Sequence, residues 1–190
     1  MSTSGGVAGA TLPASYNDLL GWTFDLECCV QAVAPTAAAS LQLLRIPISV
    51  TTTVTNTLLT IAAVGNTVTH CYTALYTSAG TVVGQSADQS SAWGTGGSAF
   101  TALTVALSGG PYTVTPLSSD DFVWGAIYIG TAVSLPTFYA AQNLAAFVNL
   151  GTTASRRRLG TYAVSNTATL PNITPGSIVS GGNGMWMGIN

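Results

Sequence analysis

From residue 41 onward, apolar and polar side chains alternate in short runs, and Gly, Pro, Ser and Asn separate one run from the next. In residues 44–50, for example, four aliphatic side chains alternate with Arg45, Pro47 and Ser49. A period of two in residues that suit a pleated, half-buried surface predicts β-strands. Helical periodicity is almost absent, so the chain is predicted to be all-β.

The fold class that these short strands predict is an antiparallel β-sandwich, jelly-roll-like, with an N-terminal arm. Pro47 argues for an edge or a bulge, because it cannot donate to a ladder. Ser78-Ala79-Gly80 predicts a hairpin turn, with Cys71 and Leu75 on one face of the preceding strand and three other side chains on the opposite face. Residues 85–98 are expected to form a polar loop, and residues 139–150 could form one or two helical turns. Strands are expected at residues 44–50, 57–64, 70–77, 81–84, 100–107, 111–115, 122–129, 160–164 and 184–189.

The composition changes near residue 40, which predicts an arm over residues 1–40 and a sandwich domain over residues 41–190. The arm is rich in Gly, Ser and Ala, apart from a patterned piece at residues 16–27 that contains Trp22 and Phe24. Spacing alone leaves open whether this piece is extended or forms a helical turn. The arm is expected to serve attachment or oligomerisation. Its start lacks the basic region of a signal peptide, which favours a cytosolic origin.

Charged residues make up only 5% of the 190 residues, with six acids, four Arg, no Lys and a net charge of −2. This charge is too small to steer the chain onto nucleic acid, and no run reaches the ~18 apolar residues of a membrane span. We therefore expect no nucleic-acid partner and no membrane insertion. A monomer of this mass exposes roughly 8,400 Å², so either uncharged polar residues solvate the surface or neighbouring subunits cover it. The lack of Lys on edge strands favours association with other copies.

Catalysis needs positioned acids, bases or nucleophiles, and the chain has one His, His70, with no nucleophile motif beside it. His70 is expected to be structural. The pair Asp120-Asp121 is expected to be a solvated turn, although it could help to bind a cation. The three Cys residues form no zinc-ligand spacing and are expected to be small buried hydrophobes, with a Cys71 bridge to Cys28 or Cys29 as the alternative. The chain is thus predicted to be no enzyme and to need no cofactor or metal.

Three of the four bases stand together at Arg156, Arg157 and Arg158. This run is either a solvated loop or a docking patch for acidic groups of a partner, to which the guanidinium fork is suited. Together with Trp22 and Phe24 of the arm, it forms the candidate set for partner docking.

Trp93 stands in the polar loop with Gln85, Asp88 and Gln89. An aromatic ring among polar side chains could be a sugar-stacking platform, and these four residues form the candidate glycan contact. The alternative is a loop Trp that folds back to close the end of the sandwich.

Several segments in their order resemble a module found in proteins of tailed phages of actinobacteria: residues 41–48, residues 74–81, residues 85–93, residues 170–175 and the closing Trp186-Met187. The resemblance covers residues 41–190 and implies a jelly-roll-like, non-enzymatic virion part. We expect a capsid decoration or minor capsid protein on the virion surface, forming a homotrimer that contacts the major capsid protein or tail proteins. The alternative is a tail-tip or fibre-associated module that binds host cell-wall glycans.

Overall fold

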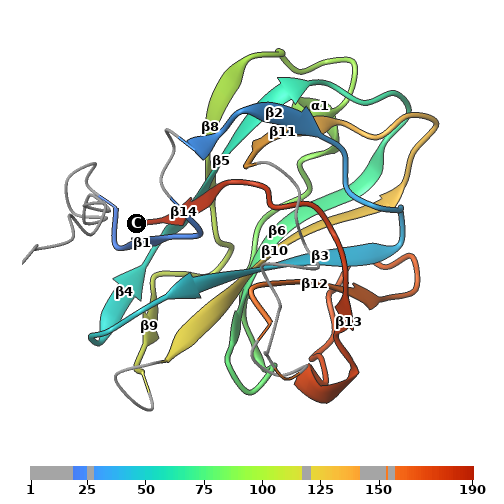
Figure 1. The fold of residues 1–190 in the computed structure, drawn as a ribbon. Coiled ribbons are helices and arrows are strands. Elements are labelled where there is room, and N and C mark those ends of the chain that lie inside the picture. The colour runs from blue at the N-terminus through green and yellow to red at the C-terminus, as the bar shows by residue number, and fades with distance from the viewer. Residues whose placement is uncertain (1–18, 25–27, 117–120, 142–152, 154–156) are drawn as a thin grey trace, which may run out of the picture.

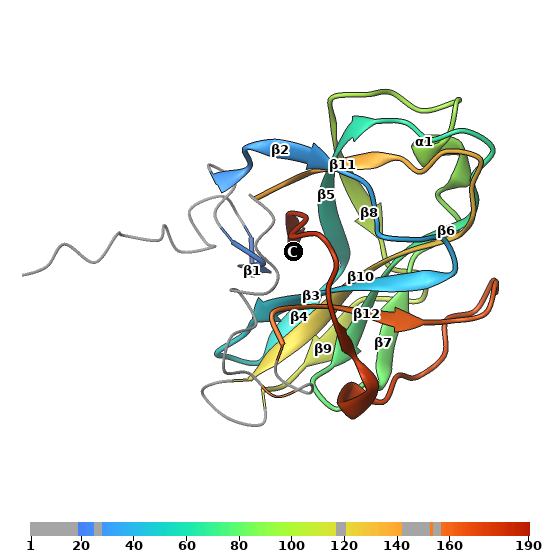
Figure 2. The same cartoon turned by 45° about the vertical axis from the view of Figure 1, so that its right-hand side comes forward.

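Two antiparallel sheets face each other across the main core (Figures 1 and 2). The computed structural model describes residues 19–24, 28–116, 121–141, 153 and 157–190. Sheet A has the order β1 (Gly21–Trp22), β14 (Met187–Ile189), β5 (Asn56–Ala63), β11 (Thr137–Ala140) and β2 (Gln31–Val33), with β8 (Thr101–Ala106) on the other side of β5. Sheet B has the order β13 (Val179–Ser180), β12 (Leu159–Ala163), β3 (Ser40–Pro47), β10 (Phe122–Thr131), β6 (Thr69–Thr77) and β7 (Val82–Gln85).

The predicted all-β antiparallel sandwich is confirmed. The hairpin at residues 78–80 joins β6 to β7, where Gly80 donates its N–H to the Thr77 carbonyl at 2.9 Å. The two faces of β6 also lie as predicted, because Cys71 and Leu75 pack in the core between the sheets while Tyr72 belongs to a second cluster. A small third sheet pairs β4 (Thr52–Val54) with β9 (Tyr112–Val114).

The central strands of sheet B, β3 and β10, are buried on both faces, so they lack the simple alternation of an exposed sheet. Every residue of β10 except the last is buried, and the strand reads as one apolar run. The outer face is covered by Leu170, Ile173 and Ile178, which follow β12 in the chain. This cover includes the short 3₁₀ helix η4 (Pro175–Ser177) and is tied to the β6–β7 hairpin by the Ile173 N–H, which donates to the Gly80 carbonyl at 2.9 Å.

Part of the expected N-terminal arm is folded into sheet A. β1 pairs with β14, with Gly21 opposite Ile189, and β2 pairs with β11, with Val33 opposite Phe138. Figure 1 shows β1 beside β14 at the left of the molecule. Residues 19–24 and 28–40 therefore include strands of the sandwich, whereas residues 1–18 lie outside the described residues.

Three local expectations are corrected. The stretch at residues 85–98 is not all loop, because Ser90–Trp93 forms the helical turn α1. Residues 139 and 140 extend β11 instead of starting a helix, while residues 142–150 lie outside the described residues. Pro47 is the last residue of β3, an interior strand, so the expected edge or bulge is wrong. Its nitrogen faces the same side as the main-chain N–H of Arg45, toward β12, and the pairing of β12 with β3 extends only as far as Leu44, so no ladder hydrogen bond is lost at Pro47. No helix in the described ranges is long and apolar enough to span a membrane.

Replacing Gly80 with Ala is expected to destabilise the fold. Gly80 has a φ of +89°, and a Cβ there would lie 2.2 Å from the Ile173 carbonyl oxygen, so the hairpin and the cover would have to separate. We expect a loss of about 1–3 kcal/mol in the free energy of unfolding, measured by urea denaturation. Gly176→Ala is the control, because a Cβ at Gly176 meets nothing within 4 Å. Equal stability of the two variants would contradict this packing.

Candidate docking site

A cavity of about 390 Å³ opens between the N-terminal segment and the ends of β3 and β12. It brings together residues that are far apart in the sequence and includes two members of the predicted docking set, Phe24 and Arg158. The cavity is lined by Thr23, Phe24, Cys28, Arg45, Pro47, Ala141, Arg158, Leu159 and Gly184.

Thr23 fixes the N-terminal segment at the cavity. Its N–H donates to the Met187 carbonyl at 2.9 Å, and its hydroxyl accepts from the Met187 N–H at 3.1 Å. The segment also lies close to β3 at Gly21, where a Cβ would stand 2.9 Å from Cγ2 of Ile46. These contacts hold the neighbouring Phe24 at the cavity wall, half-buried.

Two of the three Arg residues that the structure describes, Arg45 and Arg158, line this cavity. The guanidinium carbon of Arg45 lies 4.4 Å from the centre of the Phe122 ring, a cation–π contact, and Phe122 in turn meets Trp124 edge-on. The main-chain N–H of Arg45 donates to the main-chain carbonyl of Arg158 at 2.9 Å, which holds the two residues together. Arg158 is exposed. Sequence reasoning missed Arg45, although a cation inside an apolar strand was a signal.

The predicted arginine run divides into residues with different surroundings. Arg157 is half-buried and donates from Nη1 to the Ile178 carbonyl, so it ties the start of β12 to the cover of sheet B. Arg158 faces the cavity, and Arg156 lies outside the described residues. Of the two described members, Arg158 is therefore the one placed to meet a partner.

A second hollow of about 490 Å³ continues from this cavity along the same segment, and Pro47 lines both. Its walls include the half-buried Trp22 and two side chains with large exposed fractions, Leu20 at 46% and Val50 at 65%. We call the combined region the arm-side surface, defined by Leu20, Trp22, Phe24, Arg45, Pro47, Val50 and Arg158. It is an apolar strip with two cations at one end.

The glycan contact predicted around Trp93 is wrong, because the Trp93 side chain is 0% exposed. Its ring packs edge-on against Phe138 at 5.4 Å, and its carbonyl accepts from the Gly65 N–H at 2.8 Å. Trp93 thus closes the sandwich end, as the alternative interpretation held, and presents no ring face to a sugar.

The polar members of the predicted glycan set hold local structure together. Gln85 joins β7 to the cover, since its Nε2 donates to the Ala168 carbonyl and its Oε1 accepts from the Leu170 N–H, both at 2.8 Å. Gln89 donates from its side chain to the Ala87 carbonyl at 3.0 Å. These amides have protein partners of their own.

Asp88 holds the start of α1 against β6. Its Oδ1 accepts from the Ser90 N–H at 2.9 Å, from the Ser90 hydroxyl, and from the Cys71 N–H at 3.0 Å. Partial desolvation acts to raise the pKa of this carboxyl, but the hydrogen bonds from Ser90 and Cys71 outweigh it, so the pKa lies below its usual value.

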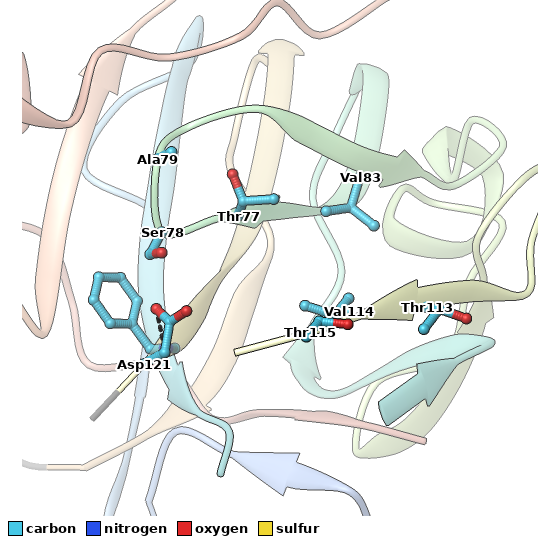
Figure 3. A pocket seen from close by; sticks show the side chains of 9 residues that line it. Thr77, Ser78, Ala79, Val83, Thr113, Val114, Thr115 and Asp121 are labelled. Atoms are coloured by element: carbon cyan, nitrogen blue, oxygen red, sulfur yellow. Dashed lines mark hydrogen bonds between the residues drawn. The ribbon is translucent and has the colours of Figure 1, made fainter. Parts of the chain in front are cut away.

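A third, smaller hollow of about 230 Å³ contains the buried carboxylate of Asp121 (Figure 3). Asp121 comes directly before β10 and accepts the Phe122 N–H at 2.8 Å, so its predicted solvation is wrong. Asp120 lies outside the described residues. Within the described ranges there is no group of three or more His, Cys, Asp or Glu that could hold a metal.

The three cysteines differ in exposure, and all are free thiols. Cys71 is buried as predicted, whereas Cys28 is exposed, which corrects the expectation for that residue. Burial raises the pKa of the Cys71 thiol to about 11, although a hydrogen bond with Ser90 acts in the opposite direction. His70 is the second residue of β6, with its Nδ1 3.4 Å from the Tyr72 hydroxyl.

Replacing Asp88 with Asn is expected to destabilise the protein at pH 7 and to have little effect at pH 2. A carboxyl whose pKa is lowered by folding adds stability above its unfolded pKa of about 3.9, and this stability is lost as the pH falls through the lower folded value. Thermal unfolding of both proteins at the two pH values measures the difference. An equal gap in Tm at both would contradict a role for the charged carboxylate.

Iodoacetamide at pH 8 is expected to label Cys28 in the folded protein and to leave Cys71 unmodified. The thiolate is the reactive form, and Cys71 is both buried and held protonated. Peptide mass spectrometry before and after unfolding in guanidinium reports each site. Fast labelling of Cys71 in the native state would contradict the described core.

No protein-family model, curated protein or solved structure matches the chain.

Proposed function

We propose that this chain is a non-enzymatic structural protein of a tailed-phage virion, a capsid decoration or minor capsid protein that binds its virion partner through the arm-side surface. The observation that carries the proposal is the arm-side surface itself, where Phe24 and the exposed Arg158 line one cavity and Trp22 lines the hollow beside it. The sequence analysis grouped these three residues as docking candidates, although Arg158 is far from the other two in the chain.

The chemistry of this surface suits a partner segment that is mainly apolar with an acidic group at one end. An exposed ion pair such as one formed by Arg158 contributes about 0–1 kcal/mol. Burial of apolar area contributes about 25 cal/mol per Å², so the exposed Leu20 and Val50 would supply more of the affinity than the charge. The cations would then select the orientation and the partner.

Two further features support a structural role in an assembly. A chain with only ten charged side chains among 190 residues has a surface that is weakly protected against association, which suits a protein that is covered by neighbours. The resemblance of residues 41–190 to a virion module of actinobacterial tailed phages points to the same setting. The major capsid protein is the partner we favour, with tail proteins as the alternative.

The glycan-binding alternative depended on an exposed Trp93 ring. Trp93 is buried, and Gln85 and Gln89 are engaged by the chain's own carbonyl and N–H groups. We therefore favour attachment to the virion over recognition of host glycans.

The test uses a phage that encodes this chain. Replacing Phe24 with Ser and Arg158 with Glu in the same protein is expected to lower its copy number per virion at least tenfold. The apolar contact of Phe24 is lost, and the positive charge at position 158 becomes negative. Quantitative mass spectrometry of purified particles, normalised to the major capsid protein, gives the copy number. Ala87→Glu, which adds an acid at an exposed position outside the arm-side surface, is the control.

Two results would contradict the proposal. One is normal incorporation of the folded double variant, since the arm-side surface would then not be the attachment site. The other is absence of the unmodified chain from purified virions combined with binding to host cell-wall glycans on an array. Circular dichroism of the isolated variants checks that they fold.

A further inference from the structure

The outer edge of β8 is open along the part of the chain that the structure describes. β8 pairs with β5 on one side, and no other described strand pairs with it on the opposite side. Three of its residues, Ala102, Thr104 and Ala106, are exposed. β8 is thus an edge strand that retains pairing capacity.

The hydrogen bonds just beyond β8 fix which residues point outward. The Leu107 N–H donates inward to the Thr55 carbonyl at 3.0 Å, whereas the Ser108 N–H donates outward to the Gln85 carbonyl at 2.8 Å. Because main-chain groups alternate along an antiparallel strand, the N–H and C=O groups of Ala102 and Thr104 point away from β5. From Leu107 onward the outer side is occupied, because Leu107 forms a bridge with Ser86.

Natural proteins usually protect such an edge with Lys, Pro, a bulge or an inward charge. β8 contains no Lys, no Pro and no charged side chain. Its pairing with β5 runs in continuous register from Thr101 to Ala106, without a bulge. The chain has no Asp, Glu, Lys or Arg from residue 89 to residue 119. An identical edge therefore meets no electrostatic repulsion, and its small side chains allow close approach.

We propose that β8 pairs antiparallel with β8 of a second copy of this chain, about a twofold axis at Leu103. The proposal rests on the proposed function, because it adds a surface through which neighbouring copies on the virion would associate with each other. Ala102 of one copy lies opposite Thr104 of the other, and the two such pairs exchange four main-chain hydrogen bonds. The product is a dimer rather than the trimer that the family resemblance led us to expect.

The partner that the open edge of β8 favours is a second copy of this chain. A twofold pairing satisfies the same donors and acceptors on both strands, so one free edge completes the other.

The dimer is expected to be weak in free solution. Stable interfaces bury about 800 Å² on each partner, and one short strand supplies less. On a virion surface, where many copies are held close together, the local concentration is high and weak pairing suffices.

Cross-linking tests the register directly. In a background with Cys28→Ser and Cys29→Ser, a mixture of the single variants Ala102→Cys and Thr104→Cys is expected to form a disulfide-linked dimer under mild oxidation. Opposed residues in a hydrogen-bonded pair are about 5.5 Å apart between Cα atoms, within the range that a disulfide spans. Each variant alone places its thiols roughly 8–9 Å apart and is expected to cross-link far less.

Sedimentation up to about 1 mM protein tests the energetics. The unmodified chain is expected to show concentration-dependent dimerisation, with a weakening of at least tenfold in Thr104→Lys, because the edge gains a charge on each side of the axis. Thr104→Ser keeps the N–H and the small side chain and is expected to dimerise normally. Thermal unfolding confirms that both variants fold.

The proposal is overturned if Thr104→Lys associates like the unmodified chain, if no association occurs over this range, or if the mixed variants cross-link no more than each variant alone. These results differ from failure of the proposed function, which is measured as copy number per virion. A chain that incorporates into virions but does not pair through β8 overturns this inference alone.

Discussion

The burial of sheet B on both faces is the constraint on which the rest of the structure depends. Its central strands β3 and β10 are paired along both edges, and their side chains pack into the main core on one face and against the cover on the other. The cover is held to the β6–β7 hairpin at Gly80 and to β7 by Gln85. Loss of these ties would expose a large apolar sheet face to water.

The same arrangement sets the position of the arm-side surface. β14 pairs with β1. Arg157, just before β12, donates a hydrogen bond to the Ile178 carbonyl and so ties the start of β12 to the cover. As a result, the N-terminal segment, Arg45 and Arg158 meet at one end of the sandwich. The arm-side surface is therefore a consequence of how the sandwich is closed.

Much of the fold could be predicted from sequence, because a period of two and Gly/Pro turns report local geometry. The two faces of β6 and the hairpin at residues 78–80 are examples. Short strands such as β1 and β2 were not predicted as strands of the sandwich, since their partners lie more than a hundred residues away in β14 and β11. The sequence left open whether the Trp93 ring is exposed to a sugar or folded back, because its polar neighbours in the sequence do not report that the ring packs on Phe138.

The site was predicted in part for the same reason. Phe24 and Arg158 were each visible as local anomalies, but no sequence signal placed them in one cavity or added Arg45.

The most direct test of the proposed attachment is cryo-electron microscopy of an intact phage that encodes this chain. Attachment predicts density for this chain at symmetry-related positions on the capsid, with the arm-side surface turned toward the coat subunits. Density with this surface turned toward solvent, or no density on the particle, would contradict it.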